Sequence, residues 1–156
     1  MPPLNPQLLA LRESATVALA DQVRRMRAAG RAVIALQTGD PDFPTPAPIV
    51  AAAVRAMGKG LTHYCASRGL PELRQAIAEH LRNERGVAYD PDTEILVTCG
   101  GIHAYYCALQ AVLAPGGEVL VPDPAWMSHV NLVELLSGRA VRVPSRAENG
   151  FWPASA

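Results

Sequence analysis

Residues 94–143, EILVTCGGIHAYYCALQAVLAPGGEVLVPDPAWMSHVNLVELLSGRAVRV, decide the fold. Short apolar runs alternate in this stretch with segments of helical length, and glycine or proline separates one from the next. The predicted strands are 94–98, 118–121 and 139–143, and the predicted helices are 102–113 and 128–137. Strands that alternate with helices pair in parallel and are covered by helices on their faces. The sequence therefore predicts an α/β fold with a mostly parallel sheet.

Three further helices and one strand are predicted on the N-terminal side of this unit. Each helix has apolar residues at helical spacing, and glycine or proline marks its start or its end. The helices are predicted at 14–29 with Ser14 as the cap and Gly30 at the end, at 47–57 after a Thr45 cap, and at 71–85 with Pro71 in the first turn and Gly86 at the end. A short apolar run at 33–36 predicts the strand.

Residues 38–46, TGDPDFPTP, form the predicted domain boundary. Their prolines and glycine exclude a helix or a central strand. We therefore expect residues 1–44 to belong to one domain and residues 45–156 to begin another. Because three parallel strands would leave a sheet edge unpaired, we also expect a longer protein or a partner that completes the sheet.

Charge and composition exclude several kinds of partner. The chain has 14 basic and 14 acidic residues, and the basic ones are scattered, so neither nucleic acid nor an anionic membrane is expected to bind. No apolar run approaches the roughly 20 residues that span a bilayer, and no signal-peptide pattern is present, which predicts a cytoplasmic protein. Cys65, Cys99 and Cys107 lack the spacing of a zinc site, so we expect no metal and interpret the three as reduced, buried residues.

Two features lie where α/β sheets bind ligands, beyond the carboxyl ends of the strands. The turn Gly100-Gly101-Ile102 leads from a strand into a helix, whose first amide groups can hold an anion such as phosphate. Trp126 follows the next strand, where its ring could stack on a planar cofactor. Each feature also has an ordinary interpretation, since a tight turn favours glycine for steric reasons and a tryptophan buries area under a helix.

Several motifs together carry a resemblance to a known family. The order Gly39-Asp40-Pro41-Asp42-Phe43, Tyr64, Gly100-Gly101 and Pro124-Ala125-Trp126 resembles class I aminotransferases of the bacterial aspartate type, over about residues 12–143. These are fold type I enzymes of amino acid metabolism that use pyridoxal 5'-phosphate. The resemblance implies a three-layer α/β/α domain of the pyridoxal-phosphate transferase fold, of which 45–156 is the first part, with 1–44 belonging to a smaller domain.

The resemblance assigns roles to two residues before the parallel-sheet unit. Gly39 would lie beside the carboxylate of the substrate, with its backbone N–H as a donor. Tyr64 would form a hydrogen bond with the cofactor phosphate of the neighbouring subunit, which implies a homodimer with shared active sites. The ordinary alternatives are a turn glycine at Gly39 and a packed tyrosine at Tyr64.

The resemblance also assigns the cofactor contacts inside the unit. Gly100 would form the turn, the amides of Gly101 and Ile102 would hold the cofactor phosphate, and Trp126 would stack on the pyridine ring. Relatives often have a polar or lysine side chain at the Ile102 position, which in some helps to bind the second carboxylate of an acidic substrate. Isoleucine cannot do so, and Arg12 is an alternative source of that charge. Acidic, neutral and aromatic amino acids therefore stay open as donors.

The chemistry of the family requires a lysine that binds the cofactor covalently and a carboxylate that faces its ring nitrogen. Lys59 is the only lysine, follows a helix-terminating glycine, and does not match the family's lysine. We therefore expect no catalytic residue among these 156 residues and no activity from them alone. The parent protein is predicted to transfer an amino group between an amino acid and a 2-oxo acid.

Three other interpretations remain open at this point. Carbon–sulfur lyases and decarboxylases share the fold and the early motifs. A non-catalytic sensor would join such a domain to a DNA-binding module, for which residues 1–11 are too short. A truncated product without catalysis is the third alternative.

Overall fold

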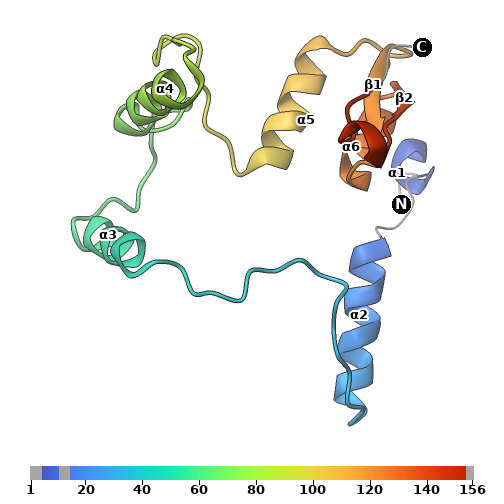
Figure 1. Ribbon diagram of the computed structural model, residues 1–156. Helices are drawn as coiled ribbons and strands as arrows, with labels where there is room; N and C mark the ends of the chain where they lie inside the picture. Colours follow the sequence, from blue (N-terminus) through green and yellow to red (C-terminus); the bar gives the residue numbers. More distant parts are fainter. Residues whose placement is uncertain (1–4, 11–14, 154–156) are drawn as a thin grey trace. The chain divides into compact units, whose positions relative to one another are not determined.

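The computed structural model describes residues 5–10 and 15–153. Within this part of the chain the elements are α-helices, two β-strands and one 3₁₀ turn (Figure 1). In chain order they are α1 (Pro6–Ala10), α2 (Ala15–Ala28), α3 (Ala47–Gly58), α4 (Pro71–Arg85), α5 (Gly101–Val112), β1 (Glu118–Asp123), α6 (Met127–Leu135), β2 (Arg139–Pro144) and η1 (Ala147–Asn149).

The contacts divide the chain into two compact units. One unit comprises residues 1–38 and 100–156, and the other comprises residues 39–99. The parallel strands and the glycine turn belong to the first unit, whereas α3 and α4 belong to the second. These units are not the predicted domains, 1–44 and 45–156, which are those of a longer protein. The predicted boundary between residues 44 and 45 stays a prediction.

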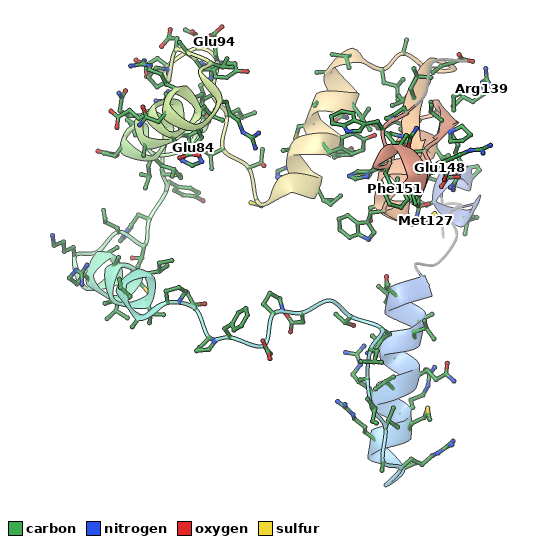
Figure 2. All side chains as sticks on the ribbon, viewed as in Figure 1. Glu84, Glu94, Met127, Arg139, Glu148 and Phe151 are labelled. Carbon is green, nitrogen blue, oxygen red and sulfur yellow. The ribbon has the colours of Figure 1, made fainter. Side chains whose placement is uncertain are left out.

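Strands β1 and β2 pair in parallel, in a register that runs from Glu118 opposite Arg139 to Asp123 opposite Pro144. Helix α6 connects the two strands, as the alternating pattern of the sequence predicts. Arg139, labelled in Figure 2, forms an ion pair with Glu118 across the first register position. The β-α-β arrangement is thus as predicted, and the remaining core of this unit is apolar. Its buried members are Leu109, Val121, Val130 and Val133.

Two predicted strands are wrong. Residues 94–98 form no strand in the described part of the chain, although Ile95 is buried and the amide of Val97 donates to the carbonyl of Arg68 at 3.0 Å. Residues 33–36 are irregular, and Ile34 and Leu36 are each 89% exposed. The reason is the same for both segments: an apolar run becomes a strand only when a neighbour satisfies its backbone groups, and the described residues supply no such ladder here.

The helix ends follow local signals in most cases. Helix α4 begins at Pro71 and ends before Gly86, whose φ of 68° is left-handed, as predicted. For α3 the expected Thr45 cap is wrong: the capping residue is Pro46, whose carbonyl accepts from the amides of Ile49 and Val50. The backbone remains extended through Pro46, with ψ of 133°, so the first helical residue is Ala47. Ser14 lies outside the described residues.

Several predicted absences concern only the described residues. There, no helix has the length and apolar character needed to span a membrane. The same residues contain no cluster of histidine, cysteine and carboxylate side chains suited to a metal ion. Cys65, Cys99 and Cys107 form no disulfide within the described residues, but Cys65 and Cys99 are exposed, so the expectation that they are buried is wrong for these two. Both lie in irregular segments rather than in a helix or strand, which explains the exposure.

Candidate functional site

The turn at Gly100 opens onto the first residues of α5. Gly100 has φ of 94° and ψ of 166°, a backbone conformation that favours glycine, and α5 begins at Gly101. The amides of Gly101 and Ile102 occupy the first helical positions, which have no acceptor inside the helix, and the helix dipole adds partial positive charge. A Cβ built on either glycine would meet no atom within 4 Å. The amides of Gly101 and Ile102 are therefore backbone donors of the kind that an anion site requires.

Trp126 lies in a second feature of the same unit. Trp126 immediately precedes Met127, which is the first residue of α6 and is labelled in Figure 2. Trp126 is 58% exposed. Its ring lines a cavity of about 380 Å³ whose walls come from α5, β1 and α6. The other lining residues are Tyr105, Val119, Leu120, Val121, Pro122, Ala125 and His129. The walls are mostly apolar, so the cavity suits a flat, largely apolar ring.

Tyr105 connects the glycine turn to this cavity. It follows Gly101 by one helical turn, about 6 Å along the helix axis at 1.5 Å per residue. Its ring lies 5.1 Å from the ring of His129 at 77°, and its hydroxyl donates to the carbonyl of His129 at 3.4 Å. The ring of His129 in turn lies 6.1 Å from the ring of Trp126 at 85°. The structure thus joins the predicted anion site and the predicted stacking residue through two ring contacts.

Neither His129 nor Tyr105 is among the site residues predicted from the sequence. The available signal for Tyr105 was its spacing from Gly101, which places both residues on one face of a helix. His129 follows Trp126 by three residues, which is also the spacing of neighbours on one helix face, but its contact with Tyr105 depends on how α5 packs against α6.

Gly39 and Tyr64 belong to the other compact unit. Gly39 lies in the irregular segment before α3, and a Cβ there would meet no atom within 4 Å. Tyr64 is fully exposed, and with His63 and Cys65 it lines a cavity of about 280 Å³. Within the described residues, the side chain of Tyr64 is therefore not packed against neighbours. A common site for all the predicted residues stays a prediction.

Lys59 and Asp123 are charged residues with structural surroundings of their own. Lys59 is exposed and directly follows α3, where its amide donates to the carbonyl of Arg55 at 3.1 Å. This is the solvated loop position that the sequence indicates. Asp123 ends β1, and its Oδ1 accepts from the guanidinium of Arg142 at 3.2 Å, so it forms a cross-strand ion pair rather than a cap for α6.

Comparisons with known proteins give one consistent result. The family model for class I and II aminotransferases matches residues 31–152. The chain is 43% identical over 148 residues to an aspartate/prephenate aminotransferase of Cereibacter sphaeroides, a match that covers 95% of this chain and 37% of that protein. It is 41% identical over 150 residues to an aspartate/prephenate aminotransferase of Thermus thermophilus, covering 96% of this chain and 39% of the relative. The chain therefore spans about two fifths of the length of these relatives.

Solved structures agree with this result. The aspartate aminotransferase of Thermus thermophilus with maleate superimposes with a TM-score of 0.91 at 40% identity, covering 99% of this chain and 40% of the other. Apo-BacF of Bacillus subtilis superimposes with a TM-score of 0.90 at 31% identity, again over 99% of this chain and 40% of the other. The α/β fold with a parallel sheet and the resemblance predicted from the sequence are confirmed.

Proposed function

The chain belongs to the class I and II aminotransferase family, and from this premise we propose that the whole protein is a pyridoxal-phosphate-dependent aminotransferase. It transfers an amino group between an amino acid and a 2-oxo acid. Relatives at about 40% identity are named aspartate aminotransferase or aspartate/prephenate aminotransferase, and these names support this class of reaction.

One observation about the chain's own residues supports the proposal most directly. The glycine turn at the start of α5 and the exposed ring of Trp126 lie in the same unit, joined by the contacts of Tyr105 and His129. Pyridoxal phosphate consists of an anionic group and a flat heteroaromatic ring. The amides of Gly101 and Ile102 suit the first, and the Trp126 ring in its apolar cavity suits the second.

The residues present therefore fit the cofactor's phosphate and ring. When bound, the cofactor supplies the electron sink that amino-group transfer needs. The lysine that would bind it covalently is not among the residues that line the Trp126 cavity, and Lys59 lies in the other unit. We assign no catalytic step to Lys59.

The substrate contacts form the second part of the proposal. The backbone N–H of Gly39 donates to the substrate carboxylate, in an exposed segment with open space around the glycine. The apolar side chain of Ile102 offers no charge to a second carboxylate, which weakens the case for aspartate as the preferred donor. The names of the relatives favour aspartate, so a panel of donors decides between acidic, neutral and aromatic amino acids.

The assembly is the third part of the proposal. In a homodimer, Tyr64 of one subunit reaches the cofactor phosphate of the other. The fully exposed side chain of Tyr64 supports this, because no neighbour within the described residues covers it. A tyrosine hydroxyl left in solvent in one chain is available as a donor across an interface.

The test is an assay of the purified full-length protein with pyridoxal phosphate, 2-oxoglutarate and a panel of acidic, neutral and aromatic amino acids. We expect cofactor-dependent formation of glutamate and of the 2-oxo acid of the donor. Trp126→Ala should raise the cofactor Kd roughly tenfold, since a large aromatic contact is lost, while His80→Ala, at an exposed position of α4, should not change it. Release of ammonia instead of glutamate would identify a lyase and reject the aminotransferase.

A further inference from the structure

The ring of His129 stands between two other aromatic rings and is nearly perpendicular to both. The centroid distances are 5.1 Å to Tyr105 and 6.1 Å to Trp126, with interplanar angles of 77° and 85°. These values are within the range in which edge-to-face ring pairs attract each other beyond the area they bury. All three rings line the same cavity next to β1.

His129 is itself held more firmly than Trp126. Its backbone amide donates to the carbonyl of Trp126 at 3.0 Å, and its backbone carbonyl accepts from the hydroxyl of Tyr105. The residue is half-buried, and its ring contacts the ring of Tyr105. Trp126, in contrast, is 58% exposed, and the structure gives its ring no contact with another aromatic residue of the described chain besides His129. Among the aromatic rings of the described chain, His129 is therefore the one placed to orient the ring of Trp126.

The three residues also connect two separate elements. Tyr105 belongs to α5, whose first turn carries the amides of Gly101 and Ile102, and Trp126 precedes α6. Because His129 contacts both rings, it couples the position of the Trp126 ring to the N-terminal part of α5. A site that holds an anion at the first turn of α5 and a ring against Trp126 needs a constant distance between these two places.

We propose that His129 is a positioning residue, which together with Tyr105 fixes the plane of the Trp126 ring relative to the first turn of α5. The inference rests on the proposed function, in which Trp126 stacks on the ring of pyridoxal phosphate. His129 acts through Trp126 and is not assigned a contact with the cofactor. Its effect is to preorganise the stacking surface, so that less side-chain freedom is lost when the cofactor binds.

The first measurement needs no cofactor. In the full-length apo-protein, with every tryptophan other than Trp126 replaced by phenylalanine, time-resolved fluorescence anisotropy reports the local motion of the Trp126 ring. We expect His129→Ala to add a fast component to the anisotropy decay. His129→Phe restores the slow decay because it keeps a ring at the same place, and His80→Ala on α4 serves as the matched histidine control.

The second measurement is the Kd of pyridoxal phosphate for the same variants in the otherwise unmodified protein. We expect His129→Ala to raise the Kd about three- to tenfold and His129→Phe to recover most of the loss, as the strength of one edge-to-face pair predicts. If His129→Ala acted only by lowering the stability of the protein, His129→Phe would not restore both the anisotropy decay and the Kd.

The outcomes separate the two proposals. If His129→Ala leaves the anisotropy decay unchanged, or if His129→Phe fails to restore it, the positioning role is overturned. If the anisotropy changes as expected but the cofactor Kd does not, His129 does hold the Trp126 ring, and its control of cofactor binding is overturned. If the unsubstituted protein binds no pyridoxal phosphate, the proposed function fails, and the anisotropy decay still decides whether His129 holds the Trp126 ring.

Discussion

The guanidinium of Arg74 lies 3.0 Å from Oδ1 of Asp92, and the two side chains are 8% and 79% exposed. The same arginine donates from Nε to the carbonyl of Gly69 at 3.3 Å and from Nη1 to the carbonyl of Pro91. It therefore links the first turn of α4 to the loop before residues 94–98. Most of this linkage is to backbone carbonyls, since the carboxylate partner is in solvent.

Replacing Arg74 should destabilise the second unit more than replacing its ionic partner. Arg74→Met removes a buried donor from two carbonyls and should cost about 1–3 kcal/mol. Asp92→Asn should cost less than about 1 kcal/mol, because ion pairs with an exposed partner contribute little. Urea unfolding of the full-length protein, with hydrogen exchange of the amides of residues 90–97, measures both. Equal losses from the two variants would contradict the importance of the backbone contacts.

A side chain at Gly69 should destabilise the second unit. It has φ of +98°, and a Cβ there would lie 2.7 Å from both Cβ and Cγ2 of Val97. Gly69→Ala should cost about 2–4 kcal/mol, from left-handed backbone strain together with overpacking. Gly116 is the matched control, because its φ is +76° and a Cβ would meet no atom within 4 Å. Gly116→Ala should cost only the backbone strain, about 1–2 kcal/mol. Thermal unfolding measures the loss of stability in each variant. A similar loss for Gly69→Ala and Gly116→Ala would show that the contact with Val97 is absent.

Asp90 should contribute to stability in a pH-dependent way. The hydroxyl of Thr93 donates to Oδ2 and the amide of Asp92 donates to Oδ1, and these hydrogen bonds lower the pKa of Asp90 from its usual value of 3.8. Because the folded pKa is below the unfolded one, the stabilisation is complete above about pH 5 and is lost as the pH falls through the unfolded value to the folded one.

We therefore expect Asp90→Asn to reduce the difference in Tm between pH 5 and pH 3. Glu84→Gln, at an exposed position near the end of α4 that Figure 2 labels, is the control for the general effect of one carboxylate. An unchanged difference in Tm for Asp90→Asn would show that the two hydrogen bonds do not favour the charged form.

The contrast between α4 and residues 94–98 shows what could be predicted from the sequence. Helix α4 was predicted from Pro71 in its first turn and Gly86 after its last, and both signals act through local backbone geometry. The strand at 94–98 had an equally clear apolar pattern and was wrong, because strands depend on a partner that is distant in the sequence. Helix α6 ends at Leu135 rather than at Ser137, since Ser137 has φ of 62° and Gly138 donates to the carbonyl of Val133.

The same distinction applies to the candidate site. Gly100 and Trp126 could be recognised because each follows a predicted strand, where α/β folds place their ligands. The role of His129 could not be recognised, since in the sequence it is an ordinary residue of a helix. Its contact with Tyr105, which joins it to the glycine turn, appears only when α5 and α6 pack together.

The amide of Gly101 provides a direct test of the anion site. Proline is well tolerated at the first position of a helix, where the missing N–H has no acceptor in the helix. Gly100 has ψ of 166°, which is compatible with a following proline, and a Cβ at Gly101 would meet no atom within 4 Å. Gly101→Pro therefore removes one donor with little damage to α5.

We expect Gly101→Pro to raise the Kd of pyridoxal phosphate about tenfold or more, because a hydrogen bond to a charged group contributes roughly 1.5–3 kcal/mol. Gly101→Ala keeps the N–H and should weaken binding less. The Kd is measured by equilibrium dialysis of the full-length protein, and circular dichroism checks that the helix content is retained. The comparison separates the donor from the shape of the turn: equal weakening by both variants would mean that space at Gly101, and not its N–H group, limits cofactor binding.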